Sequence, residues 1–291
     1  MHHFRGLISK PSSSASREKL KKKEHYLKNG SALLEEFIAL CDRNCRIALR
    51  YFGATEIERA TKESAENRVI FIGGMYMVKG LLDKRRVLVR FRDSTFHRNS
   101  SDICRDVAIT SQMGHLKNVL KLIGCFLEYA EPVMVYEYVK EATTHHNLLF
   151  NNDDHARNTD LNSQKVFIDL SSGVAKLFDF SFSISLPPGE LEVEAQDAVC
   201  GTCEHIDPEY CCSAIVTQKT DVYGFGNVLF QLLAGKEKPG IDHEIRQQLE
   251  NYLDLVKRCT ASKGEDRPYM IYVAKELRRI EKCFRALNSL T

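Results

Sequence analysis

Apolar side chains recur at the spacing of a helix face in three parts of the chain, and this period predicts amphipathic helices. Charged residues lie between the apolar positions of the first and third stripes, so we expect these two helices to pack one face against a core, whereas we expect the second stripe to supply a buried helix. The first stripe comprises Leu33, Leu34, Phe37, Ile38 and Cys41. The second comprises Val222, Phe225, Val228, Leu229, Leu232 and Leu233, and the third Met270, Val273, Ala274, Leu277, Ile280, Phe284 and Leu287.

Runs that are rich in β-branched and aromatic residues predict strands at residues 69–72 and 87–91. The Asp-Lys pair at residues 83–84 suits a turn between strands. Upstream, Thr55 and Glu58 have the spacing of a capping box, in which a hydroxyl and a carboxylate satisfy unpaired amides at a helix N-terminus. We therefore expect a short helix that starts at Thr55.

The first 30 residues carry few side chains that a core could bury. Serines fill much of residues 10–16, and residues 17–23 are highly charged. We predict a disordered basic arm over residues 1–30, followed by an N-terminal helical extension over residues 31–66.

Charge and composition narrow the range of partners. The 291 residues include 41 Lys and Arg against 39 Asp and Glu, so we expect neither nucleic acid nor an anionic membrane as the main partner. The N-terminus lacks the apolar run of a signal peptide, and no segment approaches the ~20 apolar residues of a membrane span. The ten cysteines are scattered, which favours free thiols in a reducing cytosol. We predict a cytoplasmic protein without a transmembrane segment.

Three motifs follow one another between residues 179 and 226. They are Asp179-Phe180-Ser181, GTCEHIDPEY at residues 201–210, and TQKTDVYGFG at residues 217–226. Their order and spacing resemble the activation segment of a protein kinase and the buried helix after it. More narrowly, they resemble the receptor-like cytoplasmic kinases of plants. Among these, the chain is similar to the pseudokinases that serve as adaptors or decoys for a nucleotide-binding leucine-rich-repeat immune receptor.

The resemblance implies an α+β, protein-kinase-like fold with two lobes. The kinase-like domain then spans residues 67–287, with an N-lobe at about 67–136 and a C-lobe at about 139–287.

Two parts of the chain are short for a kinase. Only 22 residues separate Glu137 from Asp160, fewer than a kinase uses for the helices that carry its catalytic loop. The stretch from Gly235 to Leu253 is short as well. We therefore predict shortened or missing helices in the C-lobe, which leaves open whether the chain folds stably.

The positions that do kinase chemistry are replaced. In a kinase an Asp accepts the proton of the substrate hydroxyl, a Lys follows two residues later, and an Asn five residues later binds magnesium. The resemblance places Asp160, Asn162 and Lys165 at these positions. Because a cation repels the metal that this last position should bind, we expect no catalysis by these residues.

The phosphate-binding positions are replaced too. The glycine positions of the kinase flap fall on Ile70, Ile72 and Met75, whose side chains prevent close approach of the backbone to phosphate. Arg90 takes the position of the phosphate-binding Lys, and Asp106 that of its Glu partner. Since a guanidinium is not a conservative replacement for an ammonium, we interpret Arg90 and Asp106 as a structural pair first and a nucleotide clamp second.

Asp179 keeps the carboxylate that binds magnesium in a kinase, but the resemblance supplies no second metal ligand, and Ser181 replaces the usual Gly. Arg90, Asp106 and Asp179 are therefore degenerate ATP and magnesium positions. We expect that no cofactor is required, and residual binding of ATP with magnesium stays open.

Residues that hold the shape of a kinase remain. The resemblance implies that Glu209 pairs with Arg267 and ties the activation segment to the bottom of the C-lobe. Asp221 takes the position of an Asp that holds the backbone of the catalytic loop. We predict that these three residues have structural roles.

A zinc site is an alternative interpretation of the segment around residue 205. Its potential ligands are Cys200, Cys203, His205, Cys211 and Cys212. The same segment aligns with an activation segment that needs no metal, and the sequence has no second spaced pair of cysteines. We therefore predict no metal site.

A kinase shape without kinase chemistry favours a binding module. We predict a catalytically inactive pseudokinase that acts as an adaptor or decoy in plant immune signalling, through contact with a leucine-rich-repeat immune receptor and other kinases. The expected contact surfaces are the helix at residues 33–41 and the segment at residues 185–199. Such partners would bring this cytoplasmic protein to the periphery of the plasma membrane. A weakly active ATP-dependent serine/threonine kinase is the alternative, and a degenerate chain with neither role is the third.

Overall fold

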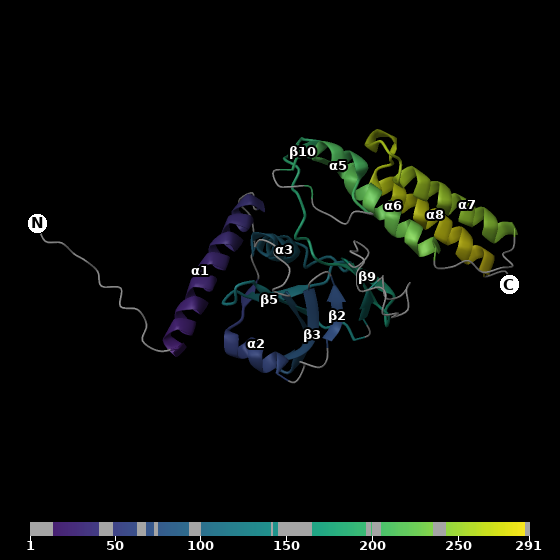
Figure 1. Ribbon diagram of the computed structural model, residues 1–291. Coiled ribbons are helices and arrows are strands. Elements are labelled where there is room, and N and C mark those ends of the chain that lie inside the picture. The colour runs from purple at the N-terminus through teal and green to yellow at the C-terminus, as the bar shows by residue number, and fades with distance from the viewer. Residues whose placement is uncertain are drawn as a thin grey trace, which may run out of the picture. The chain divides into compact units, whose positions relative to one another are not determined.

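A computed structural model shows two compact units (Figure 1). The first comprises residues 1–141 and 171–181, and the second residues 142–170 and 182–291. The structure describes residues 14–40, 49–62, 68–72, 75–92, 100–140, 142–144, 165–195, 199, 205–234 and 243–288.

The first unit is built on a mostly antiparallel sheet. Among its described residues the strand order is β1-β5-β6-β4-β3-β2, and only β1 runs parallel to its neighbour, β5. The strands predicted at residues 69–72 and 87–91 are confirmed as parts of β2 and β4. The bounds are β1 (Arg50–Tyr51), β2 (Arg68–Ile72), β3 (Met75–Leu82), β4 (Arg85–Arg92), β5 (Leu122–Phe126) and β6 (Val133–Glu137).

The predicted turn joins β3 to β4. Its two residues, Asp83 and Lys84, both have a positive φ, of 48° and 62°. A two-residue hairpin loop with positive φ at both positions has the twist that antiparallel strands need. The turn therefore fixes the register in which Leu82 pairs with Arg85.

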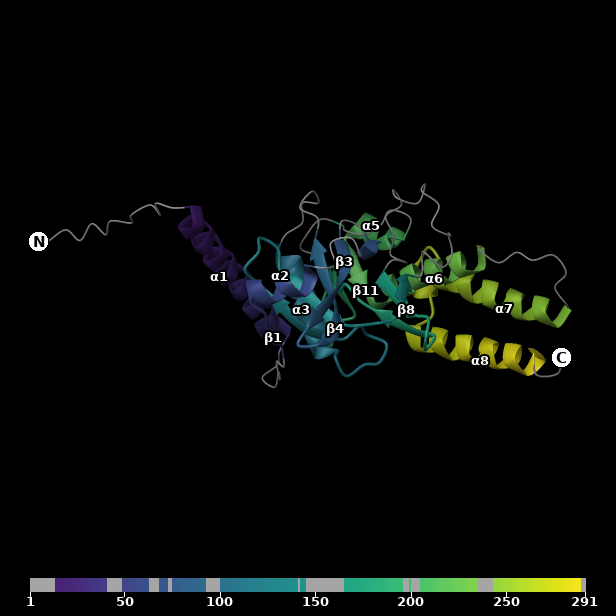
Figure 2. The ribbon, with the colours of Figure 1, turned by 90° about the horizontal axis from the view of Figure 1, so that it is seen from below.

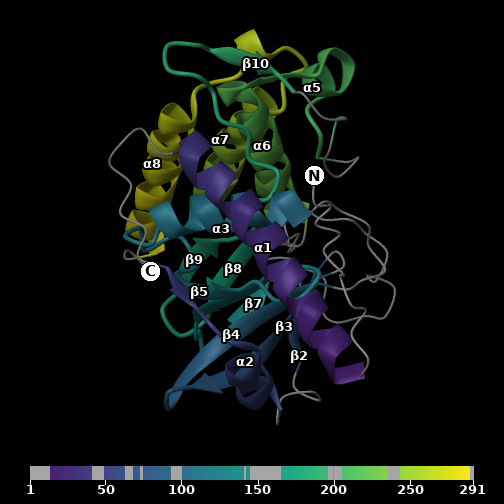
Figure 3. The same ribbon diagram turned by 90° about the vertical axis from the view of Figure 1, so that its left-hand side faces the viewer.

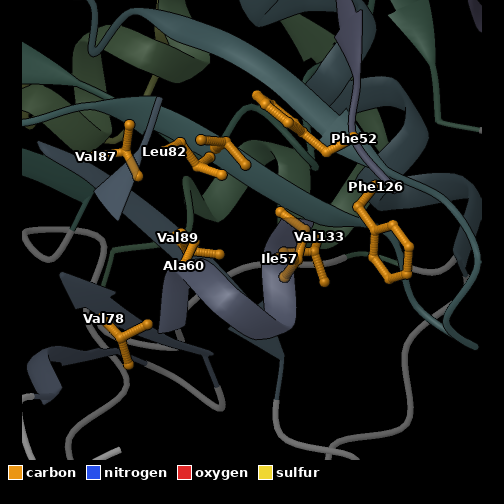
Figure 4. Packing of buried hydrophobic residues seen from close by; sticks show 10 residues of the cluster. Phe52, Ile57, Ala60, Val78, Leu82, Val87, Val89, Phe126 and Val133 are labelled. Carbon is orange, nitrogen blue, oxygen red and sulfur yellow. The ribbon is translucent and has the colours of Figure 1, made fainter. Parts of the chain in front are cut away.

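The core of the first unit lies between the sheet and α2 (Ala54–Thr61) (Figure 4). Gly80 of β3 lies where α2 comes close, because a Cβ atom at this position would be 3.3 Å from the carbonyl oxygen of Ala60 and 3.2 Å from the side chains of Val87 and Val89. A larger residue there would force α2 or its neighbours to shift. The buried cluster comprises Phe52, Ile57, Ala60, Val78, Leu82, Val87, Val89, Phe126, Val133 and Val135.

The start of α2 differs from the prediction. Gly53 is the N-cap residue, and its N–H donates to Glu56 Oε2 at 2.8 Å. Thr55 lies inside the first turn of the helix. The prediction that Thr55 caps the helix with Glu58 is therefore wrong, although a carboxylate does satisfy an N-terminal amide as expected.

Helix α1 (Ser14–Leu40) corrects the prediction of a disordered arm over residues 1–30. The helix already runs through residues 14–30, and residues 1–13 lie outside the described residues. The boundary predicted between residues 30 and 31 therefore falls inside one helix. Its many Lys, Glu and Ala residues have high helix propensity, which the compositional argument for disorder overlooked.

Helix α1 is packed against α3 (Ser100–Gln112), which it crosses in Figure 3. Leu33 and Phe37 are buried, and Asn29 is fully buried. The Asn29 side-chain amide donates to the carbonyl oxygens of Leu127 and Tyr129 at 2.9 and 2.8 Å. These bonds fasten α1 to the connection between β5 and β6, so the helix belongs to the first unit.

Residues 171–181 belong to the first unit although they are distant from it in sequence. Within them, β9 (Val174–Leu177) is held by backbone hydrogen bonds: Leu177 N–H donates to Asn118 O at 2.7 Å, and Leu120 N–H donates to Leu177 O at 2.9 Å. Lys176 adds an ion pair with Glu137 at 2.8 Å. This attachment carries the following residues, 178–181, into the first unit.

The second unit is mainly helical. Helix α7 packs against both α6 and α8, and Figure 2 shows α7 and α8 running alongside each other. Short strand pairs join β7 to β8 and β10 to β11, both antiparallel. The bounds are β7 (Ala142–Thr144), β8 (Val166–Asp169), β10 (Glu192–Glu194), α5 (Pro208–Ser213), β11 (Ile215–Thr217), α6 (Gln218–Ala234), α7 (His243–Cys259), the short η3 (Gly264–Asp266) and α8 (Met270–Asn288).

The core of the second unit contains the two helices that were predicted at the second and third apolar stripes, α6 and α8. Its buried residues are Val222, Leu229, Leu255, Val256, Cys259, Val273 and Ile280. Gly226 of α6 permits the close approach of α7, since a Cβ atom there would be 2.7 Å from Cys259 Cβ. In the final stripe Val273 and Ile280 are buried and Leu277 packs against this cluster. Met270, Ala274 and Phe284 are exposed, so the packed face is narrower than predicted.

The two shortened regions fall largely outside the described residues, at 145–164 and 235–242. In the part of the chain that the structure describes, a single α-helix, α7, lies between α6 and η3. None of the described helices is long and apolar enough to cross a membrane.

Candidate functional site

The centre of the candidate site is Arg90 on β4. Its Nη1 atom is 2.5 Å from Asp106 Oδ2, and Asp106 is fully buried on α3. The predicted contact between these two residues is therefore present. Nη1 also donates to the hydroxyl oxygen of Tyr136 on β6 at 3.1 Å.

Asp179 is the second carboxylate at the same guanidinium. Arg90 Nη2 lies 3.3 Å from Asp179 Oδ1, and the Ser181 hydroxyl donates to the same oxygen at 2.8 Å. Asp179 is 5% exposed and has a φ of 64°, in the left-handed region. Sequence reasoning placed Arg90 beside Asp106 but did not foresee that Asp179 shares the guanidinium.

Asp106 also holds the backbone of the residue after Asp179. Its Oδ1 atom accepts the Phe180 N–H at 2.9 Å and the Thr110 hydroxyl at 2.9 Å. Each oxygen of the Asp106 carboxylate therefore accepts at least one hydrogen bond, as a buried carboxylate requires. The network joins β4, β6, α3 and residues 179–181.

Burial and charge act in opposite directions on this network. Burial raises the pKa of Asp106 and Asp179 raises it further, whereas the positive charge of Arg90 and the Phe180 N–H lower it. Burial raises the pKa of Tyr136 as well. Arg90 supplies the positive charge that lets Asp106 and Asp179 approach each other in a buried site.

The described surroundings of Asp179 do not fit a magnesium ion. One oxygen of Asp179, the expected metal ligand, already accepts hydrogen bonds from Arg90 and Ser181. Magnesium prefers six oxygen ligands, and a guanidinium beside its carboxylate repels it. At the glycine positions, Ile70 and Ile72 lie on β2 and Met75 lies on β3, while residues 73–74 lie outside the described residues. Poor binding of nucleotide by this flap remains a prediction.

The catalytic positions are only partly visible. Asp160 and Asn162 lie outside the described residues. Lys165 is described, and its Nζ atom lies 4.9 Å from the ring centroid of Phe182. Asp221 stands exposed in the first turn of α6. Although the residue as a whole is exposed, neighbouring atoms remove part of the water around the Asp221 carboxylate and raise its pKa, whereas the positive charge of Lys165 lowers it.

The predicted ion pair of Glu209 with Arg267 is present at 3.9 Å, but a closer partner of Arg267 was not predicted. Arg267 makes two hydrogen bonds with Asp207, at 2.5 and 2.7 Å, and both side chains are buried. Glu209, the predicted partner, lies 3.9 Å from Arg267 with its side chain half exposed. The Glu209 carboxylate also accepts the Gly264 N–H, at the shorter distance of 2.7 Å. Glu209 is therefore a secondary neighbour of Arg267.

Arg267 uses all five of its N–H groups. Besides the two bonds to Asp207, it donates to the carbonyl oxygens of Ala261, Ser262 and Lys219 at 2.7, 3.0 and 3.2 Å. Because every N–H donor of the guanidinium has an acceptor, the free-energy cost of burying its charge is reduced. The Lys219 ammonium in turn donates to the Arg267 carbonyl oxygen.

A local signal could have found Asp207. This residue precedes Pro208 and Glu209 and is the N-cap of α5, where its carboxylate accepts the Glu209 N–H at 3.0 Å. An Asp directly before a Pro at the first helical position is a typical helix start. Sequence reasoning instead assigned Arg267 to Glu209 from the kinase resemblance alone.

The zinc alternative finds no support among the described residues, where no three His, Cys, Asp or Glu side chains are grouped as metal ligands. Cys211 and Cys212 are exposed on α5, whereas His205 is buried with its Nε2 atom 3.1 Å from Gln231 Nε2. Cys200 and Cys203 lie outside the described residues.

No family model matches the chain, but curated proteins do. The chain is 32% identical to the non-functional pseudokinase ZED1 of Arabidopsis thaliana, over 92% of this chain and 99% of that protein. It is 30% identical to the inactive serine/threonine-protein kinase ZRK12 of the same plant, over 92% of this chain and 82% of the relative. It is 28% identical to the serine/threonine-protein kinase ZRK4, also from this plant, over 94% and 97%.

These likenesses define a protein of the kinase class with a kinase-like, two-lobed fold. The chain belongs to the plant family of receptor-like cytoplasmic kinases that includes the ZED1 and ZRK pseudokinases. The alignment with ZED1 runs over 337 positions, more than the 291 residues of this chain, so this chain has gaps relative to ZED1. The fold class and the resemblance predicted from sequence are confirmed.

Proposed function

We propose that this chain is a pseudokinase that works by binding other proteins and does not transfer phosphate. The observation that carries the proposal is the contact of Arg90 with both Asp106 and Asp179. The carboxylate that would hold magnesium in a kinase is buried against a permanent positive charge. A kinase needs this carboxylate for its metal, so the arrangement favours a fold kept for its surface.

Phosphotransfer tests the first half of this proposal. Purified full-length protein, with magnesium, radiolabelled ATP and a general protein substrate, should incorporate no more phosphate than the Asp179→Ala variant. Incorporation that disappears in Asp179→Ala would instead support the alternative, a weakly active serine/threonine kinase. The presence of Asp179 and the kinase names of some relatives, such as ZRK4, keep that alternative in the test.

The proposed partners are a leucine-rich-repeat immune receptor and other kinases, bound by protein–protein contact. The surface that we propose for it on α1 needs one correction. Leu33 and Phe37, at the start of the predicted contact helix, are only 2% and 4% exposed because they pack in the first unit. Leu27, Leu34 and Ile38 lie on the outer side and are 58%, 56% and 68% exposed. We refer to these three residues as the outer stripe of α1.

The activation-segment surface consists of residues 185–195 in the described part of the predicted range. Three exposed carboxylates, Glu190, Glu192 and Glu194, alternate along this segment, and the last two belong to β10. Leu191 between them is 72% exposed. Alternate residues of a strand share one face, so the carboxylates form an acidic edge suited to a basic partner segment.

Co-purification tests the second half of the proposal, that the protein binds other proteins. The wild-type protein and the Asp179→Asn variant should recover equal amounts of a candidate receptor, because we expect binding to depend on the surface and not on this buried carboxylate. Recovery that is lost in Asp179→Asn, with folding unchanged, would contradict the proposal and tie binding to the kinase-like site.

A further inference from the structure

The site in the first unit holds its own cation. In kinases, magnesium bound with ATP neutralises the Asp that opens the activation segment. Here the Arg90 guanidinium lies 3.3 Å from the equivalent carboxylate, Asp179. We propose that Arg90 permanently replaces the metal ion, and that residues 179–181 are held in place without metal or nucleotide. This inference deepens the proposed loss of catalysis, but each can fail without the other.

The geometry shows why one guanidinium can serve two carboxylates. Nη1 faces Asp106 at 2.5 Å and Nη2 faces Asp179 at 3.3 Å, so the planar fork spans the space between them. A lysine ammonium is a compact point charge and would not offer two separate nitrogen atoms. Arg90 is 4% exposed, which keeps water from screening either contact.

The network also resists the entry of a divalent ion. A metal that took Asp179 as a ligand would have to displace the Arg90 guanidinium. Displacement would break the contact with Asp106, whose other oxygen holds the Phe180 N–H at 2.9 Å. A fully buried carboxylate would then be left without its cation, which is strongly unfavourable.

The consequence is a fixed connection between elements that move relative to each other in many kinases. The Arg90 cluster joins β4 to α3 through Asp106, to β6 through Tyr136, and to the segment after β9 through Asp179. Every one of these residues is at most 5% exposed. The first unit therefore keeps α3 and residues 179–181 in one arrangement, which suits a protein that is recognised by shape.

Removal of the guanidinium should create the metal response that wild type lacks. The Arg90→Gln variant removes the guanidinium that contacts both Asp106 and Asp179, so MnCl2 should raise its melting temperature by several degrees. Wild type should show no shift with MnCl2, or with MgCl2 and ATP. The matched control is Arg92→Gln: Arg92 lies on the same face of β4 and pairs with Glu131 at 3.3 Å. This control should not acquire a response to manganese.

Two outcomes would overturn the inference. The first is a manganese or magnesium-ATP shift in wild type that is lost in Asp179→Asn, since the metal would then displace Arg90. The second is a folded Arg90→Gln variant that does not respond to manganese.

A double variant keeps the test decisive if Arg90→Gln does not fold. Adding Asp179→Asn to Arg90→Gln removes one of the two facing charges and should restore a cooperative melting transition, whereas Asp179→Asn alone should lower the melting temperature. No rescue in the double variant would contradict the inference. Phosphate incorporation is measured separately: activity would overturn the proposed function, whereas a metal response of wild type without activity would overturn this inference alone.

Discussion

The guanidinium of Arg267 and the carboxylate of Asp207 form a buried bidentate pair, with hydrogen bonds of 2.5 and 2.7 Å. Glu209, which the kinase resemblance names as the partner, lies 3.9 Å away and is half exposed. Asp207 thus performs two tasks, since it also caps the N-terminus of α5. The second unit therefore depends on Asp207 more than on Glu209.

Substitutions at these two carboxylates should differ in cost. We expect Asp207→Ala to destabilise the protein by about 3–5 kcal/mol, because Arg267 would stay buried without its counter-charge. Glu209→Ala should cost about 1 kcal/mol, since solvent screens a half-exposed carboxylate. Urea denaturation followed by circular dichroism measures both free energies of unfolding.

Two controls refine this comparison. Asp207→Asn keeps a helix-capping oxygen and removes the charge, so a loss near that of Asp207→Ala would assign the effect to the ion pair. Glu265→Ala, whose side chain is 76% exposed, should be close to neutral. Equal losses for Glu209→Ala and Asp207→Ala would show that the two carboxylates share the role after all.

The inner and outer sides of α1 should respond differently to truncation. Phe37→Ala removes a ring that is 4% exposed and should cost about 3–5 kcal/mol, through lost burial and the cavity that remains. Leu34→Ala, at a position 56% exposed, should change stability by less than about 0.5 kcal/mol. Thermal unfolding of the full chain measures the difference. Similar melting temperatures for the two variants would mean that α1 does not pack on the first unit in solution.

Sequence patterns predicted the structural elements that are determined by residues close to each other in the chain. The Asp83–Lys84 turn follows from turn chemistry, and the last helix, α8, follows from apolar periodicity. The extent of α1 was missed because its N-terminal half is polar. Its buried anchor, Asn29, is a polar residue whose partners Leu127 and Tyr129 lie about a hundred residues further along the chain. Nothing near Asn29 in the sequence indicates that contact.

The candidate site shows the same limit. The Arg90–Asp106 contact was predictable because both residues occupy positions that pair in kinases. The contact of Arg90 with Asp179 joins residues that are 89 positions apart, and the sequence argument considered Asp179 only as a metal ligand. The preference of Arg267 for Asp207 over Glu209 depends on side-chain burial, which no spacing of residues reveals.

Burial of three cysteines predicts a pH effect. Burial raises the pKa of Cys104 and Cys125 to about 12 and that of Cys259 to about 11, from an ordinary value of 9.0. The folded state therefore keeps these protons where the unfolded chain has lost them. The protonated thiols therefore contribute fully to the free energy of unfolding below pH 9, and this contribution decreases as the pH rises from about 9 to 12.

Alkylation checks the same three thiols directly. At pH 8.5, iodoacetamide should modify the exposed Cys211 and Cys212 within minutes and leave Cys104, Cys125 and Cys259 unmodified in the native protein. Mass spectrometry of tryptic peptides identifies the modified residues, and reaction in urea provides the control. Fast native alkylation of Cys104 would indicate that α1 separates readily from α3, because Cys104 donates to the Asn29 carbonyl oxygen there.

The outer stripe of α1 should decide whether the protein recognises its partner. Leu27, Leu34 and Ile38 are each more than half exposed, and apolar residues grouped on one exposed helix side are typical of binding surfaces. We expect Leu34→Asp combined with Ile38→Asp to reduce co-purification of a leucine-rich-repeat receptor at least tenfold, because a charge would be buried at the contact. The melting temperature should stay within about 2 °C of wild type, since neither residue belongs to the core.

Leu81→Asp is the matched control for these surface changes. Leu81 lies on β3 in the same unit and is 59% exposed, so it presents a similar apolar side chain on a different element. The control should recover as much receptor as wild type. If the outer-stripe variant also recovers the receptor in full, α1 is not the contact surface, and the acidic edge at Glu190, Glu192 and Glu194 becomes the surface to substitute next. Equal loss in both variants would instead mean that any added carboxylate weakens binding, because long-range repulsion from an acidic partner would act on the whole unit.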